Sequence, residues 1–277
     1  VFSVASRANP LLPIDEEYLY LAWGQNWDIN MENPLRSIRI DQDRIKSRIY
    51  SSNYVNIKPT DKINFRTTFA IDQGEQQYYE YIPSDVQQAK RNSFRGRAIH
   101  NIDNAFNYQW DNTLTYENQI QSHHLFALFG NSLSKNQYKW TNVLARDFPT
   151  DDFGYYNLGA AFDKQQFQLG SDITQSTLMS FVGRINYNYK EKYYATLTGR
   201  YDGSSKFAKG NKWGFFPSVS VSWNVTKEDF MDDQKLFDLL NIRMGYGNVG
   251  NQAIPDYAFY SLYYPSYSSG NVSFNST

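Results

Sequence analysis

Hydrophobic and polar residues alternate along residues 215–225, which read FFPSVSVSWNV. The odd-numbered positions are apolar and include Val219, Val221 and Trp223. The even-numbered positions from 218 onward are small and polar, and include Ser218, Ser220 and Ser222. Because successive side chains of a strand point to opposite faces, this pattern predicts a strand with one apolar and one polar face.

The aromatic residues near this stretch gather at the ends of predicted strands. Four tyrosines flank the predicted turn at residues 190–192, namely Tyr187, Tyr189, Tyr193 and Tyr194. Trp213 and Phe215 open the next strand. A soluble β-sandwich also produces alternation, with its apolar side in the core. Aromatic rings at both ends of an apolar face instead favour an antiparallel transmembrane β-barrel, whose two membrane interfaces carry such rings.

The same alternation predicts strands along most of the chain. The predicted strands are residues 44–57, 63–71, 105–117, 124–130, 179–189, 193–201, 213–225 and 239–246, with a weaker one at 18–27. In the strand at 63–71, Arg66 lies on the polar side. Residues 73–101, 133–177 and 202–212 are predicted long loops, and 263–277 is loop sequence without a strand. A short helix capped by Thr226 is predicted at 226–238. Short turns that alternate with long loops are typical of periplasmic turns and extracellular loops.

Composition narrows the class of protein. The 277 residues are 17% aromatic and 41% hydrophobic, with a mean hydropathy of −0.64. A spanning helix needs about 18 or more consecutive apolar residues, and the chain has no such run. The net charge of −1 gives no reason to expect a nucleic-acid partner. The chain has no cysteine, so it has neither disulfides nor a thiol site.

No group of residues predicts catalysis. Residues 245–250 match the G-x-G-x-x-G spacing, but Pro255 follows and no amphipathic helix begins there to bind a pyrophosphate. His123 and His124 are adjacent in a strand, so they face opposite ways and cannot share a metal, and no spacing supports a remote partnership with His100. No nucleophile with a base, and no spaced pair of carboxylates, is evident. The sequence therefore predicts a protein that is not an enzyme and has no cofactor or metal site.

Two segments resemble a known signature. Residues 200–225 and 240–252 are similar to the barrel signature of the SusC/RagA family of TonB-dependent outer-membrane transporters. Residues 111–131 and 33–74 resemble earlier hairpins of that family more weakly. The resemblance implies a plugged barrel of about 22 strands in the cell outer membrane. It also implies import of a glycan or peptide nutrient, a SusD-like surface lipoprotein partner, and energy from the TonB–ExbB–ExbD complex acting through the plug.

The length predicts that this chain is part of such a barrel. At roughly 25 residues for each strand with its connection, 277 residues supply about ten strands. Residues 1–277 are thus expected to form a partial β-barrel domain, with the signal peptide, the plug and the remaining strands outside it. The alternative is a soluble β-sandwich that binds carbohydrate.

The expected roles of individual residues follow from these patterns. Val219, Val221 and Trp223 should face the lipid bilayer, and Arg66, Ser218, Ser220 and Ser222 should face the lumen. Trp140, Tyr155 and Tyr156 are candidates for contact with a substrate or a lid protein, although aromatic residues in loops can also simply pack on each other. The motif Asp202-Gly203-Ser204-Ser205 is expected to set the geometry of a loop.

Overall fold

The computed structural model describes residues 37–86, 88–89, 92–162, 167–233 and 236–260, and the backbone of 263–268 and 271–276. The predicted strand at 18–27 lies outside these residues. Among the described residues, no helix has the length and apolar character needed to cross a membrane.

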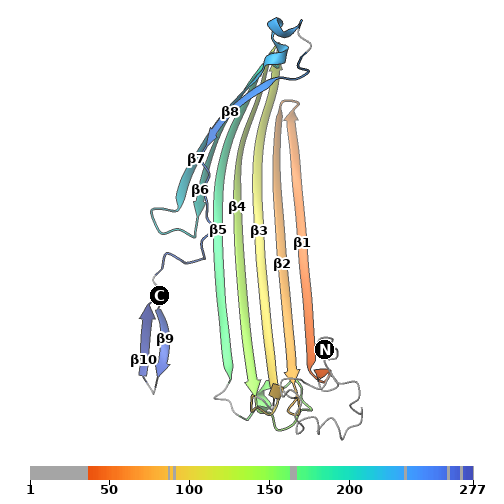
Figure 1. The fold of residues 1–277 in the computed structure, drawn as a ribbon, viewed down its shortest axis with the longest axis vertical. Helices are drawn as coiled ribbons and strands as arrows, with labels where there is room; N and C mark the ends of the chain where they lie inside the picture. Colours follow the sequence, from red (N-terminus) through yellow and green to blue (C-terminus); the bar gives the residue numbers. More distant parts are fainter. Residues whose placement is uncertain are drawn as a thin grey trace. The chain divides into compact units, whose positions relative to one another are not determined.

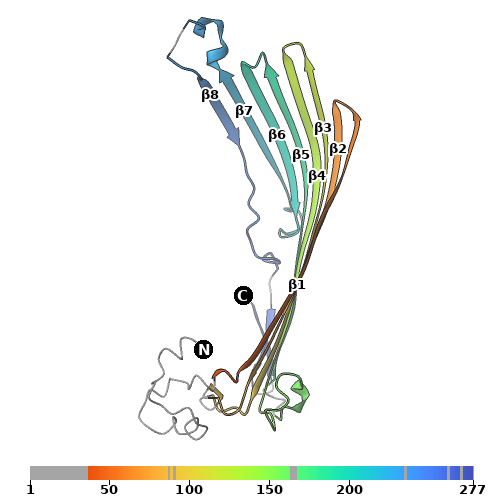
Figure 2. The same cartoon turned by 90° about the vertical axis from the view of Figure 1, so that its right-hand side faces the viewer.

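Eight strands form one antiparallel sheet in which spatial order follows chain order (Figure 1). They are β1 Asp41–Thr60, β2 Ile63–Ile82, β3 Arg97–Ile120, β4 His123–Arg146, β5 Gln168–Tyr189, β6 Tyr193–Ser204, β7 Trp213–Asn224 and β8 Asn241–Gly247. The same neighbour relations are visible from the side in Figure 2. Each strand therefore pairs with the next through a hairpin, as the sequence predicts for an all-β meander.

Contacts divide the chain into two compact units, and the strands β1 to β5 contribute to both. The first unit contains Val1–Arg48, Gln73–Ala105 and Tyr138–Ile173. The second contains Ile49–Asp72, Phe106–Gln137 and Thr174–Thr277. The second unit therefore holds all the predicted strands with clear apolar alternation from residue 179 onward.

In the second unit, the register of β5 to β8 sorts side chains onto two faces. Residues directly opposite each other in an antiparallel pair lie on the same face. Val219 is opposite Leu197 of β6 and Tyr246 of β8, and Val221 is opposite Met244. We call this the apolar face; its large members are Met179, Phe181, Ile185, Tyr187, Tyr189, Tyr193, Leu197, Tyr201, Trp213, Phe215, Val219, Val221, Trp223, Ile242, Met244 and Tyr246.

The opposite side of these strands is the polar face. It carries Arg184, Asn186, Thr196, Thr198, Arg200, Ser218, Ser220, Ser222 and Arg243. Ser218, Ser220 and Ser222 pair with Thr198, Thr196 and Tyr194 on β6, and Ser222 pairs with Arg243 on β8. The alternation read from the sequence of β7 thus extends across four strands.

Two rows of aromatic rings border the apolar face. One row runs through the register Tyr189, Tyr193 and Trp223, and the other runs through Phe181, Tyr201 and Phe215. Trp213 stacks on Tyr201 at a centroid distance of 4.8 Å. Tyr193 and Tyr201 are eight residues apart on β6, which at about 3.4 Å per residue separates the rows by about 27 Å along the strand.

The strands β2 to β5 extend beyond the segments predicted from sequence. The prediction of long loops at residues 73–101 and 133–177 is wrong for the strand extensions, and holds for the described residues within 83–96 and 147–167, which include the short turn η1 Leu158–Ala160. Strand β2 continues to Ile82, β3 begins at Arg97, β4 continues to Arg146 and β5 begins at Gln168. The physical reason is that these extensions carry polar residues on both faces, so the chain is extended there without an apolar alternation.

The point where the apolar pattern stops coincides with the boundary between the units. On β2 the odd-numbered positions are apolar up to Ile71, and then become Gln73 and Glu75. On β4 they are apolar or small from Leu125 to Leu133, apart from Asn131, and then become Lys135, Gln137 and Lys139. The boundary falls after Asp72 on β2 and after Gln137 on β4. The first unit thus begins close to the point at which the apolar alternation of β2 and β4 stops.

Three smaller expectations also need correction. The predicted helix at 226–238 is replaced, within the described residues, by two short 3₁₀ turns, η3 Val225–Lys227 and η4 Asp229–Met231. Thr226 does not cap a helix, because its hydroxyl bonds Asn224 Oδ1 at 2.6 Å. The predicted loop at 263–277 contains an antiparallel hairpin, β9 Tyr263–Ser268 and β10 Asn271–Ser276. A third 3₁₀ turn, η1 Leu158–Ala160, lies between β4 and β5.

Candidate functional site

The polar face of the second unit holds an open cavity of about 630 Å³. Its walls are β6, β7 and residues 247–252. Arg200 projects into it and donates through Nε to both carboxylate oxygens of Asp202, at 2.7 and 2.8 Å. A terminal nitrogen of the same guanidinium donates to Ser180 Oγ at 3.1 Å. The charge of Arg200 is therefore balanced by a carboxylate of its own strand.

The glycine-rich segment after β8 packs against β7. A Cβ atom added to Gly247 would lie 2.8 Å from Ser218 Cβ, and one added to Gly250 would lie 2.3 Å from Phe216 Cζ. Contacts below 3.0 Å are not tolerated by real side chains. Asn248 N also donates to Pro217 O at 3.0 Å. The glycines at 245–250 thus allow the chain to lie close to the wall, which accounts for their spacing without a bound nucleotide.

Ser205 and Lys206, in the loop between β6 and β7, form hydrogen bonds to neighbouring segments. Ser205 N donates to Thr177 O at 2.9 Å, and Thr177 N donates to Ser205 Oγ at 2.8 Å. Lys206 Nζ donates to Ile254 O at 2.9 Å and lies 3.3 Å from Asp256 Oδ1. The loop is therefore tied to β5 on one side and to the chain after β8 on the other. Residues 202–204 lie in strand β6 and not in the predicted loop at 202–212, so the loop role of residues 202–205 stays a prediction.

The residues predicted to face lipid or lumen occupy opposite faces. Val219 and Val221 are 47% and 50% exposed on the apolar face. On the polar face, Ser222 Oγ donates to Asn241 Oδ1 at 2.8 Å. The Arg66 guanidinium lies 4.2 Å from the centroid of the Tyr54 ring, a distance typical of a cation–π contact.

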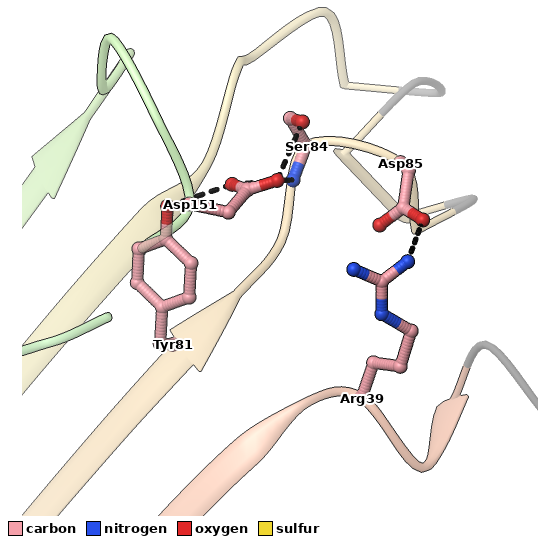
Figure 3. Close-up of polar contacts among 5 residues, drawn as sticks. All are labelled: Arg39, Tyr81, Ser84, Asp85 and Asp151. Atoms are coloured by element: carbon pink, nitrogen blue, oxygen red, sulfur yellow. Dashed lines mark hydrogen bonds and ion pairs between the residues drawn. The ribbon is translucent and has the colours of Figure 1, made fainter. Parts of the chain in front are cut away.

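A polar clasp joins two loops of the first unit (Figure 3). Asp151 accepts hydrogen bonds from Tyr81 Oη at 2.8 Å, from Ser84 N at 3.0 Å and from Ser84 Oγ at 2.8 Å. Burial, together with the hydrogen bond to Asp151, raises the pKa of the Tyr81 phenol well above its usual value. Arg39 forms an ion pair with Asp85 beside it. The loop after β4 is thereby anchored to the end of β2.

The three aromatic candidates for ligand contact differ in exposure and surroundings. Tyr155 is only 6% exposed, because it stacks on Tyr79 at 5.4 Å and its carbonyl contacts His100 Nε2 at 2.7 Å. Tyr156 is 81% exposed. Trp140 lines a separate groove together with Tyr138 and residues 168–170. Tyr155 is thus buried by its own loop and the neighbouring strands, whereas the side chains of Tyr156 and Trp140 have surface that a ligand can contact.

At the turn end of the second unit, Glu228 is a hub of hydrogen bonds. It accepts from Tyr193 Oη at 2.5 Å, from Trp223 Nε1 at 2.9 Å and from Lys192 Nζ at 3.1 Å. Lys192 also donates to Asp229 at 2.8 Å. The hydrogen bond from Tyr193, then that from Trp223 and the nearby Lys192, lower the pKa of Glu228 to about 2. The β5–β6 and β7–β8 connections are fastened together there.

His123 and His124 of β4 each have a side-chain hydrogen-bond partner. His123 Nδ1 lies 2.7 Å from Tyr187 Oη, and His124 Nε2 lies 2.9 Å from Glu117 Oε1. In the part of the chain that the structure describes, no group of three or more His, Cys, Asp or Glu residues could hold a metal ion.

Known proteins with similar sequences are bacterial receptors. The chain is 34% identical to TonB-dependent receptor P3 of Formosa agariphila over 262 residues, which are 93% of the chain and 25% of that receptor. It is 32% identical over 227 residues to TonB-dependent receptor P26 of the same organism, covering 81% of the chain and 23% of the receptor. It is 43% identical over 91 residues to TonB-dependent receptor SusC of Bacteroides thetaiotaomicron, covering 32% and 9%. No family model matches the chain.

Solved structures show the same fold. The structure of the RagAB peptide transporter superimposes with a TM-score of 0.78 and 18% sequence identity, over 88% of this chain and 27% of that one. The RagAB peptide importer in its "open-open" state gives a TM-score of 0.76 over the same share of this chain. The chain thus spans about a quarter of the length of the relatives and structures it matches.

An antiparallel meander with one apolar face between two aromatic rows, superimposable on a transporter barrel, is part of the wall of an outer-membrane β-barrel. More narrowly, the chain belongs to the SusC/RagA family of TonB-dependent receptors. The resemblance of residues 200–225 and 240–252 is confirmed. The relatives are receptors and transporters rather than enzymes, in agreement with the prediction from sequence.

Acidification should loosen the turn that Glu228 holds. Its folded pKa is lowered from 4.5 to about 2, so its stabilising contribution is complete above about pH 4.5 and is lost as the pH falls toward 2. The protection factors of the Asn224 and Val225 amides of the purified parent protein, which are corrected for the intrinsic pH dependence of exchange, should fall across that window. Glu228→Gln should exchange faster at pH 7 and show a weaker pH dependence. Identical pH profiles for the two proteins would contradict the assignment.

Removing the Lys206 ammonium should release the segment after β8. Lys206→Met loses the bonds to Ile254 and Asp256, so limited proteolysis of the purified parent should cut within residues 248–260 several-fold faster than in the wild type. Lys209→Met, in the same loop, is the matched control and should be cut at the wild-type rate. Equal rates for both variants would show that Lys206 does not hold this segment.

Proposed function

We propose that the parent protein imports a nutrient, an oligosaccharide or a peptide, across the outer membrane, and that this chain supplies part of its barrel wall. Membership in a family of TonB-dependent receptors supports this proposal. So does the fold shared with a structure described as a peptide transporter. No cofactor is required, because the wall binds and guides its cargo and changes no covalent bond.

The observation that carries the proposal is the division of β5 to β8 into two faces. The apolar face, with Val219, Val221 and Trp223, faces the lipid bilayer in this proposal. The polar face, with Ser218, Ser220 and Ser222, faces the lumen, and Arg66 does so on β2. The aromatic rows are about 27 Å apart along the strand, which at the usual tilt of about 35–45° corresponds to a height of about 19–22 Å, close to that of an apolar band about 25 Å tall.

Two partners belong to this proposal by family membership. A SusD-like surface lipoprotein would close over the barrel from outside the cell. The TonB–ExbB–ExbD complex would supply energy through the plug domain of the parent protein. Glycan and peptide cargo both remain open at this level, because fold alone does not encode the binding site.

The alternative of a soluble carbohydrate-binding sandwich finds less support. A sandwich buries the apolar face of each sheet against the other. Here Ile242, Met244 and Tyr246 on that face are 52%, 73% and 71% exposed in the described structure. Covering such a face with lipid removes the cost of its exposure to water.

A charge on the lipid-facing side should impair assembly, whereas the same charge on the lumen side should not. Val219→Arg, midway between the aromatic rows at Phe215 and Trp223, should cost roughly 2–4 kcal/mol in the full-length parent and reduce the heat-modifiable barrel band in outer-membrane fractions. Ser220→Arg, the adjacent residue on the other face, is the matched control and should assemble normally. If both variants assemble equally well, the assignment of faces is wrong.

Import itself is tested by uptake in the source organism. Cells that lack the gene for the parent protein, and cells that lack TonB, should both fail to accumulate a fluorescent oligosaccharide or peptide that wild-type cells accumulate. Restoring the parent gene should restore uptake only where TonB is present. Undiminished uptake of every tested cargo in the deletion strain would overturn the proposed function.

A further inference from the structure

A groove of about 570 Å³ lies across β3, β4 and β5 in the first unit. Its lining residues are Asn101, Asp103, Tyr138, Trp140, Thr141, Asn142, Gln168, Leu169 and Gly170. Because side chains alternate along β4, Tyr138, Trp140 and Asn142 share one side of that strand. Leu125 and Phe129, which belong to the apolar pattern of β4, alternate to the other side.

Trp140 owes its position to Gly170. A Cβ atom on Gly170 would lie 2.9 Å from Trp140 Cζ3 and 3.0 Å from Cη2. The indole therefore lies against the bare backbone of β5, and any larger residue at 170 would displace it. This contact fixes a large flat apolar surface within a groove whose other lining groups are mostly polar.

The polar groups of the groove are connected to each other. Tyr138 Oη donates to Asp103 Oδ1 at 2.6 Å, and the Asn142 side-chain amide donates to Asn101 Oδ1. Amides carry both donors and acceptors, and the Asp103 carboxylate has further acceptor capacity. Each of these groups can thus bond a ligand hydroxyl in addition to its partner in the groove.

The combination of groups indicates one class of ligand. The apolar C–H face of a pyranose packs on an aromatic ring, while its hydroxyls donate and accept in the ring plane. Among the described residues that line the groove there is no lysine or arginine, so these residues offer no cation for a carboxylate or sulfate group. A peptide would find amides here as well, but it would not need a flat aromatic surface beside them.

We propose that this groove is a subsite for a neutral oligosaccharide, with one sugar ring stacked on Trp140 and its hydroxyls bonded by Asn101, Asn142 and Asp103. The assignment deepens the proposed import function and rests on it, since it names the cargo class. Of the three aromatic residues considered from sequence, it selects Trp140 as the one that contacts cargo.

The test uses the purified full-length parent in detergent and isothermal titration. The probes are neutral gluco-, manno- and xylo-oligosaccharides of six residues, an oligogalacturonate, and an uncharged hexapeptide. At least one neutral oligosaccharide should bind, and Trp140→Ala should weaken it by about tenfold or more. Gly170→Ala, which displaces the ring without removing a groove group, should also weaken it. Phe162→Ala, an exposed loop aromatic outside the groove, is the matched control and should bind normally; heat modifiability confirms that each variant is folded.

The remaining outcomes overturn the proposal. It is wrong if no neutral oligosaccharide binds, if only the peptide or the oligogalacturonate binds, or if Trp140→Ala binds with unchanged affinity. These results are separable from failure of the import function. Loss of the groove assignment would leave TonB-dependent uptake of another cargo intact. Conversely, Trp140-dependent binding by a protein whose deletion leaves uptake unchanged would uphold the groove and overturn import.

Discussion

A chain that crosses a bilayer must satisfy every backbone N–H and C=O group internally. In this protein the ladder of β5 to β8 pairs these groups between neighbouring strands, with continuous register from Tyr189 opposite Tyr193 to Trp223 opposite Ile242. Once the backbone is paired in this way, side chains have only two faces to occupy. The apolar face, its aromatic borders and the small polar residues opposite all follow from that single requirement.

This constraint also explains which parts of the fold the sequence could predict. Within the second unit, one side of each strand is apolar, so the alternation of apolar and polar residues around Phe69 or Val219 can be recognised in the sequence. Beyond Ile71 on β2 and Leu133 on β4, water is available to both faces and the selection for apolar residues ends. The strands nevertheless continue, because pairing with a neighbouring strand satisfies the backbone as well as water does. Their continuation was therefore missed, and polar strands were mistaken for loops.

The site was predictable to a lesser degree because it depends on partners distant in sequence. The exposure of a loop tyrosine is not visible in the sequence: Tyr155 is buried by Tyr79 and His100, whereas its neighbour Tyr156 is open. Trp140 could be named as a candidate from its residue type alone. The groove around Trp140 could not be predicted, because Gly170 and Asp103 come close to β4 only when the three long strands β3, β4 and β5 pair. A glycine that packs against a tryptophan so far away in the sequence leaves no local pattern from which the contact could be predicted.

The placement of charge in the second unit follows the same physics. Ionic hydrogen bonds gather beyond the aromatic rows, at Glu228 with Lys192 on one end and at Lys206 with Asp256 on the other. There, water and short loops make charged groups inexpensive to hold. Between the rows, the polar face of β7 and β8 consists largely of serine and glycine, and Gly245 and Gly247 lie directly opposite Ser220 and Ser218. Hydrogen bonds and ion pairs thus fasten the strands at their ends, while between the rows the polar face of β7 and β8 carries mostly small side chains, with the larger Arg243 opposite Ser222.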